Sequence, residues 1–208
     1  MNGTQQFWQI AFHWGARVKV FGNLKSLVGG RDTIKPYEFY GMFEDALPRS
    51  DLSIRTNKIL DFHQLILPSN NLNYKSYASM FSHCMTSANV KAPLDLPATN
   101  LGDKCYDCMF RGCSTLTIAP AIYGSNHKYA DCYHMFSGCT NLTIPPSIPN
   151  FEYTSSNSFE GMFEGCTSLK YFPDLRVDKI DWRAYTSMFQ WCTSLTIPPS
   201  LNSKEVSV

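Results

Sequence analysis

The eight cysteines are the residues of this chain best suited to chemistry, because thiolates bind metals, form disulfides and act as nucleophiles. Two residues separate Cys105 from Cys108, which is a zinc-ligand spacing, and Cys113 follows closely. No second Cys-x-x-Cys pair or His pair completes a set of four ligands. The sequence therefore predicts buried free thiols, with no metal site and no cofactor.

Five cysteines recur at one position of an internal repeat: Cys84, Cys113, Cys139, Cys166 and Cys192. Equivalent residues of stacked repeats approach to about 5 Å, within the Cα range of a disulfide. Side chains of one column point in parallel, however, whereas a disulfide needs a particular torsion. We expect free thiols in this column, and a disulfide, if one forms, is expected to involve Cys105, Cys108 or Cys132.

No motif of a known enzyme class is present, and the histidines His13, His63, His83, His127 and His134 share no repeat position. The sequence predicts that the protein is not an enzyme. Its 18 basic and 17 acidic residues give a net charge of +1, which argues against a partner held by a basic field, such as nucleic acid or an anionic membrane.

The repeat is marked by the dipeptide Met-Phe, which occurs six times. The dipeptides lie at positions 42/43, 80/81, 109/110, 135/136, 162/163 and 188/189, so the usual spacing is 26 or 27 residues. Leu follows six residues after Phe in the last four copies, and Pro follows ten residues after it. Such columns indicate stacked units that bury one continuous core.

Within each unit the spacing predicts a short helix followed by a short strand. An aromatic residue, Met, Phe and Cys stand at i, i+3, i+4 and i+7, which is one face of a two-turn helix. Gly112, Gly138 and Gly165 suit a left-handed helix end. The fourth unit has Tyr133 only two residues before Met135, so we expect its beginning to be one residue shorter.

After each helix the hydrophobic period changes to two, as in residues 116–122, which predicts a strand. Proline after about three residues limits its pairing. The predicted fold class is an α/β repeat: a solenoid with a ladder of short parallel strands on one side and short helices on the other. Residues 1–36 are expected to form an N-terminal β cap, residues 37–201 the solenoid of about six units, and residues 202–208 a C-terminal tail. Trp191 stands where three other units have Gly and is expected to close the last unit.

Residues 37–201 resemble the BspA-like leucine-rich repeats, as shown by residues 105–120, Cys-Tyr-Asp-Cys-Met-Phe-Arg-Gly-Cys-Ser-Thr-Leu-Thr-Ile-Ala-Pro, and by the preceding residues 94–101. Such repeats occur in surface proteins of oral and gut bacteria and in phage-encoded relatives. The resemblance implies that the predicted solenoid is a leucine-rich-repeat solenoid, and it implies adhesion and the binding of proteins or glycans.

The strand alternation also predicts which side chains face outward and could bind a partner. The three predicted outward columns are Thr117, Thr143, Lys170 and Thr196; then Ala119, Pro145, Phe172 and Pro198; then Ala121, Ser147, Asp174 and Ser200, with Tyr171 and Phe172 as aromatic contacts.

The function predicted from these observations is recognition: a non-enzymatic adhesion module that binds a host-surface protein or glycan, on a phage particle or a bacterial surface. The alternative is a structural virion protein whose repeats dock on other virion subunits or, in a homo-oligomer, on another copy of the chain. Residues 1–16 contain no Lys or Arg, and no segment resembles a signal peptide or a membrane span, so neither membrane insertion nor a leader is expected in this chain.

Overall fold

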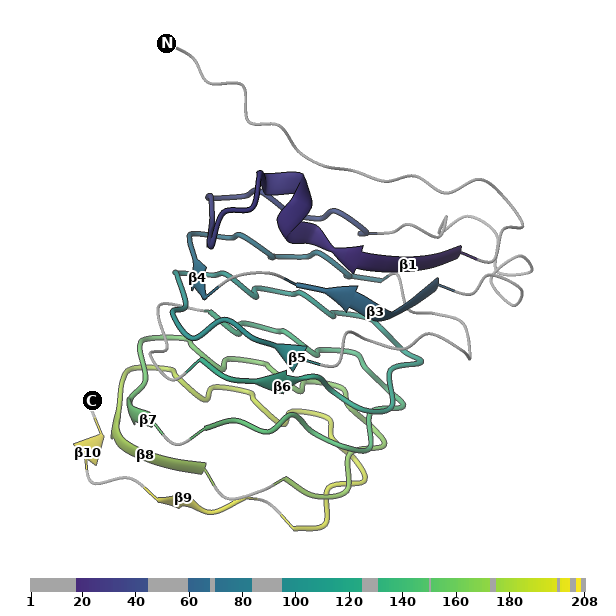
Figure 1. Cartoon of the computed structure of the whole chain (residues 1–208). Helices are drawn as coiled ribbons and strands as arrows, with labels where there is room; N and C mark the ends of the chain where they lie inside the picture. Colours follow the sequence, from purple (N-terminus) through teal and green to yellow (C-terminus); the bar gives the residue numbers. More distant parts are fainter. Residues whose placement is uncertain are drawn as a thin grey trace.

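The computed structural model describes residues 18–44, 60–67, 70–83, 95–124, 131–149, 151–172, 175–197, 199–202 and 205–206. In these residues the chain forms layers that lie one on another, with short parallel strands on one side and runs of turns on the other (Figure 1). The observed arrangement therefore stacks the repeat units, as the Met-Phe period predicts. Membership of the leucine-rich-repeat class stays a prediction.

The strands are short and all of their pairings are parallel among the described residues. They are β1 (Val18–Asn23), β2 (Thr33–Ile34), β3 (Leu60–Ile66), β4 (Asn71–Leu72), β5 (Asp95–Leu96), β6 (Ala121–Ile122), β7 (Phe151–Tyr153), β8 (Leu175–Ile180), β9 (Leu201–Asn202) and β10 (Glu205–Val206). β1 pairs with β3, β2 with β4, β5 with β6, and β8 with β7, β9 and β10. Single bridges Ile118–Ile144 and Tyr171–Ile197 mark the segments directly before the prolines. Proline has no N–H to donate, which keeps this pairing brief.

The Met-Phe segments are not helices, and this part of the predicted α/β class is wrong. Each is a run of overlapping turns, which we call a turn ribbon; the six ribbons are residues 36–44, 74–83, 103–112, 131–138, 156–165 and 182–191. Alternate N–H groups close turns inside the ribbon, as when Met42 N–H donates to the Phe39 carbonyl at 3.3 Å. The others donate to the next layer, as when Phe43 N–H donates to the Met80 carbonyl at 2.8 Å.

Every fourth ribbon residue lies in the left-handed region of φ, which explains why the helical spacing is misleading. In the third ribbon these residues are Lys104, Cys108 and Gly112, with φ of 55°, 56° and 70°. A backbone that repeats every four residues puts positions i, i+3, i+4 and i+7 on one side, as a helix does. An isolated two-turn helix is marginal, whereas the ribbon gives half of its N–H groups a partner in another layer. The glycines predicted at helix ends do adopt left-handed φ, but at the end of a ribbon.

The inward placement of the Met-Phe side chains is confirmed. Six phenylalanines stack along the layers with neighbouring ring centroids 5.3–5.7 Å apart and ring planes within 11° of parallel: Phe43, Phe81, Phe110, Phe136, Phe163 and Phe189. All are fully buried except Phe189 in the last layer, which is partly exposed. Ring pairs of this kind contribute about 0.5–1.5 kcal/mol each beyond their burial.

A second aromatic column lies three residues before each Met, and here the fourth unit differs from the prediction. Tyr106 N–H donates to the Asp131 carbonyl and Cys132 N–H to the Ser158 carbonyl, so Cys132 takes the aromatic position. The beginning of this unit is therefore not a residue shorter. A buried thiol simply replaces a ring between Tyr106 and Phe159.

The two ends of the stack differ. At the N-terminal end β1 continues into a 3-10 helix, η1 (Leu24–Val28), whose Leu24 and Val28 are buried in the core. The N-terminal cap stays a prediction: residues 18–36 contain β1, η1 and β2, and residues 1–17 lie outside the described residues. At the C-terminal end β9 and β10 both pair with β8, so Asn202 and residues 205–206 belong to a strand layer instead of a tail.

Replacing a ring inside the phenylalanine stack should be costly. Phe136→Ala removes a fully buried ring that touches Phe110 and Phe163, so we expect the free energy of unfolding to fall by about 3–5 kcal/mol. Urea denaturation measures this. Thr143→Ala, an exposed site, serves as the control and should change stability by less than about 0.5 kcal/mol. A neutral Phe136→Ala would contradict the stack as the source of stability.

The left-handed ribbon positions give a second test. Gly138→Ala should lower the free energy of unfolding by about 1–2 kcal/mol through backbone strain at its left-handed φ. Its new Cβ would add no clash, because the nearest atom would lie 3.6 Å away. Gly161→Ala should cost more, because its Cβ would lie 2.3 Å from the His134 ring. The excess should disappear in a His134→Ala background, as a double-mutant cycle of unfolding free energies would show. Equal costs in both backgrounds would mean that the ring is not the obstacle.

Candidate functional site

The recurrent cysteines form part of the framework. Their thiols donate hydrogen bonds to the carbonyl of the Phe in the preceding layer: Cys113 to Phe81 at 3.0 Å, Cys139 to Phe110 at 3.2 Å, Cys166 to Phe136 at 3.2 Å and Cys192 to Phe163 at 3.0 Å. A thiol is a weak donor that suits a small buried space. The column therefore ties adjacent layers together.

Burial also makes Cys105, Cys108 and Cys132, which lie outside this column, poor nucleophiles and poor metal ligands, since both roles require the thiolate. Burial raises the pKa of Cys108 to about 12 and raises the pKa values of Cys105 and Cys132 well above their usual range. The seven described cysteines are free thiols, and the repeat cysteine Cys84 lies outside the described residues. Within the described part of the chain, no group of three His, Cys, Asp or Glu residues is arranged to hold a metal ion.

On the strand side, the first predicted outward column is exposed. Thr117, Thr143, Lys170 and Thr196 all face solvent, and we call them the threonine column. Two of its hydroxyls donate to the layer before them: Thr143 Oγ1 to the Thr117 carbonyl at 3.1 Å and Thr196 Oγ1 to the Lys170 carbonyl at 3.4 Å. These hydroxyl protons already have partners on the protein.

The second predicted outward column is wrong where the structure describes it. Ala119 and Pro145 are buried, and Phe172 is only 5% exposed because its ring packs on Phe163 and Phe189 with centroids 5.0 and 5.2 Å away. Pro198 and Asp174 lie outside the described residues. In the third column Ser147 and Ser200 are exposed and Ala121 is half-buried.

The surface that the alternation missed is a row of large apolar side chains directly after the threonine column. Ile118, Ile144, Tyr171 and Ile197 are 56%, 45%, 51% and 67% exposed, and we call them the apolar column. Ile118 pairs with Ile144 and Tyr171 with Ile197 across neighbouring layers. Of these four, sequence analysis placed only Tyr171 on the outside.

Alternation fails to predict the apolar column because, in each unit, the chain between the last turn and the proline has no regular strand pleat. Leu116 N–H still donates to the Cys113 carbonyl in a turn, and the following residues make a single bridge. Positions 117 and 118 both point outward, and positions 119 and 120 both point inward. The available signal was that each of these short segments ends with a proline, which permits pairing but no regular strand.

The apolar column is what could recognise a partner. An exposed strip of apolar side chains on a rigid scaffold marks an interaction site more often than an isolated exposed residue does. Lys170 is the only charged residue in the threonine and apolar columns. The strip therefore offers burial of apolar area with little charge to be desolvated.

The chain matches no family model, no curated protein and no solved structure. Among the described residues, no helix has the length and apolar character needed to cross a membrane.

The buried thiols predict a loss of stability in alkali. Unfolded thiols release their protons from about pH 8.5, whereas the folded thiols of Cys105, Cys108, Cys132 and Cys139 keep theirs because burial raises the pKa of each, for Cys108 to about 12. The unfolded state then holds fewer protons, so the free energy of unfolding should decrease as pH rises above about 8.5. Urea midpoints at about pH 7 and about pH 10 would measure the decrease. Cys108→Ala should lessen it, and equal midpoints at both pH values would contradict the burial of neutral thiols.

Proposed function

We propose that this protein is a non-enzymatic recognition module and that its apolar column binds a protein on a host surface. The observation that carries the proposal is the exposure of Ile118, Ile144, Tyr171 and Ile197 in consecutive layers. The resemblance of the repeat to BspA-like sequences supports an adhesive role on a phage particle or a bacterial surface.

The chemistry of the column favours a protein over a glycan. Three of its four side chains are aliphatic, and these cannot stack on sugars as aromatic rings do. The hydroxyl protons of Thr143 and Thr196 are engaged by backbone carbonyls, which removes donors that a sugar would need. Apolar contacts with a polar rim are the usual composition of a protein interface.

A second candidate is a structural virion component that docks on other subunits. The observation in its favour is at the C-terminal end of the stack, where Tyr185, Phe189 and Leu195 pack on the core but remain partly exposed. This end lies on a different surface from the apolar column, so the two functions can be tested separately.

Binding of labelled protein to whole cells from a panel of oral and gut bacteria tests the proposal. We expect Ile144→Asp and Ile197→Asp to reduce binding at least about tenfold, because each places a charge within an apolar contact worth more than about 1.4 kcal/mol. Their unfolding free energies should change by less than about 0.5 kcal/mol, since both sites are exposed.

The matched control is Trp182→Asp, which alters an exposed apolar residue at the start of the sixth turn ribbon, away from the apolar column, and should leave binding intact. Protease treatment of the cells should abolish binding, and periodate oxidation of their glycans should not. Binding that survives both column variants would refute the assignment of the surface. Loss after periodate alone would replace the protein partner by a glycan.

A further inference from the structure

The turn ribbons give the stack a direction, because their hydrogen bonds between layers all run the same way. Phe43 N–H donates to Met80, Phe81 to Met109 and Phe110 to Met135, and the later ribbons repeat this order. Each ribbon therefore turns N–H groups toward the following layer and carbonyls toward the preceding one. On the strand side bonds run both ways, as Leu72 N–H donates to Asn100 and Asn100 N–H to Asn70.

In the last ribbon, the N–H groups that would donate to a following layer therefore lie at the C-terminal end of the stack. The N–H groups equivalent to those that join the fifth ribbon to the sixth belong to Arg183, Tyr185, Ser187, Phe189 and Trp191. None of the described residues accepts a hydrogen bond from them. A row of unpaired N–H groups at the edge of a hydrogen-bonded array is a template for another chain.

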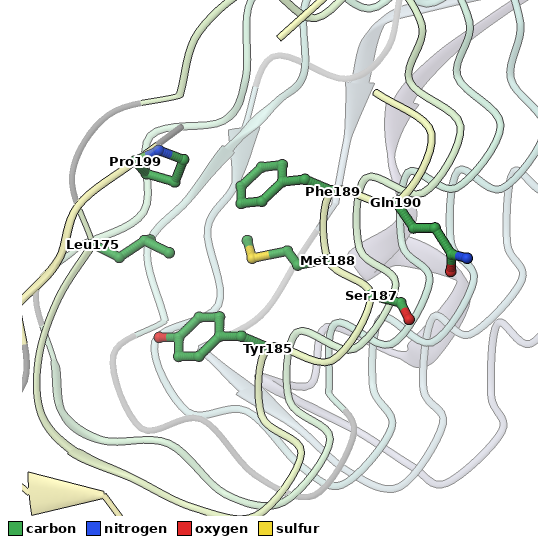
Figure 2. A pocket seen from close by; sticks show the side chains of 7 residues that line it. All are labelled: Leu175, Tyr185, Ser187, Met188, Phe189, Gln190 and Pro199. Carbon is green, nitrogen blue, oxygen red and sulfur yellow. The ribbon is translucent and has the colours of Figure 1, made fainter. Parts of the chain in front are cut away.

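An apolar hollow of about 470 Å³ lies beside this row of donors. In Figure 2 the side chains of Leu175, Tyr185, Met188, Phe189 and Pro199 converge on it, while Ser187 and Gln190 lie on the outer side of the ribbon. The buried Tyr185 hydroxyl has no hydrogen-bond partner among the described residues. Donors, apolar walls and a free hydroxyl are thus brought together at one end.

Trp191 stands at the rim of this end and does not close it, in contrast to the sequence-based expectation. The indole is 65% exposed and its φ is 61°, where the three preceding ribbons have Gly112, Gly138 and Gly165 at φ of 70–75°. A bulky residue in left-handed φ is strained. The exposed indole adds apolar surface to this end of the stack.

Among the described residues, the N-terminal end of the stack has free acceptors where the C-terminal end has free donors. The carbonyls of Glu38, Tyr40 and Met42 are equivalent to those that accept bonds from a preceding layer, and no described residue donates to them. The 3-10 helix η1 lies at this end (Figure 1), and its Leu27 is 46% exposed. Acceptors and an exposed leucine at one end match donors and an apolar hollow at the other.

We propose that the C-terminal end of the stack binds the N-terminal end of a second copy of this chain, with the donor row facing the acceptor row and Leu27 near the hollow. Two different surfaces meet in such a contact, so it is heterologous and leads to open chains or closed rings. The contact uses neither column of the strand side, so it does not rest on the proposed recognition function.

Two end-blocking variants test this contact. Pro199→Glu places a carboxylate at the hollow, and Leu27→Glu places one on the exposed face of η1. Sedimentation velocity of the unmodified chain should show a mass that grows beyond the monomer with concentration, and each variant alone should remain monomeric. An equimolar mixture of the two variants should form a dimer and nothing larger, because each keeps one intact end.

Circular dichroism and urea denaturation establish that each variant is folded. If Pro199→Glu does not fold, Trp191→Gly replaces it, since glycine relieves the left-handed strain while removing the exposed indole. Ile144→Asp is the matched control and should assemble like the unmodified chain, whatever its effect on cell binding. A monomeric unmodified chain, a Leu27→Glu variant that still assembles, or a mixture that stays monomeric would each overturn the proposal.

Discussion

Register between layers is the constraint on which the rest of this structure depends. The phenylalanine rings repeat at 5.3–5.7 Å, and in the first five ribbons N–H groups that point along the stack donate to carbonyls of the next layer. A ring stacks on its neighbours only if the backbone hydrogen bonds to the layers on both sides keep the same register. The Cys139 thiol, which reaches back to the Phe110 carbonyl, satisfies the same requirement with a side chain. Core packing and backbone bonding are thus two expressions of one periodic arrangement.

The sequence predicts which side chains lie inside but not the backbone that puts them there. Phe39, Met42 and Phe43 are buried as their spacing requires, yet the same spacing serves a helix and a turn ribbon equally well. A helix and a turn ribbon differ in the acceptors of their N–H groups. In the ribbon half of these acceptors are carbonyls of another layer, and the local sequence gives no sign of them. Ser79, His83 and Cys108 occupy left-handed φ without being glycine, so residue type gave little warning. Cys132 in an aromatic column became visible only through the hydrogen bonds of its neighbours.

In the candidate site, too, the sequence predicts some side-chain orientations correctly and others wrongly. Thr143 and Lys170 are exposed where alternation places them, because they come directly after a buried leucine. Alternation fails one residue later, where Ile118 and Ile144 point to solvent and Ala119 and Pro145 turn inward. Phe172 was expected to face solvent, but its ring packs on Phe163 and Phe189 of the phenylalanine stack. The residues that seemed suited to chemistry, above all the cysteines, are used to hold the layers, and the surface left for recognition is aliphatic.

Because each of the last four units presents one threonine-column position and one apolar-column position, the length of this strip is set by the number of such units. Gain or loss of a whole unit by gene duplication or deletion would lengthen or shorten the strip without changing the bonds that any remaining layer needs. Variation in copy number is therefore a route by which descendants of such a gene could alter their avidity for an extended target while keeping the same fold.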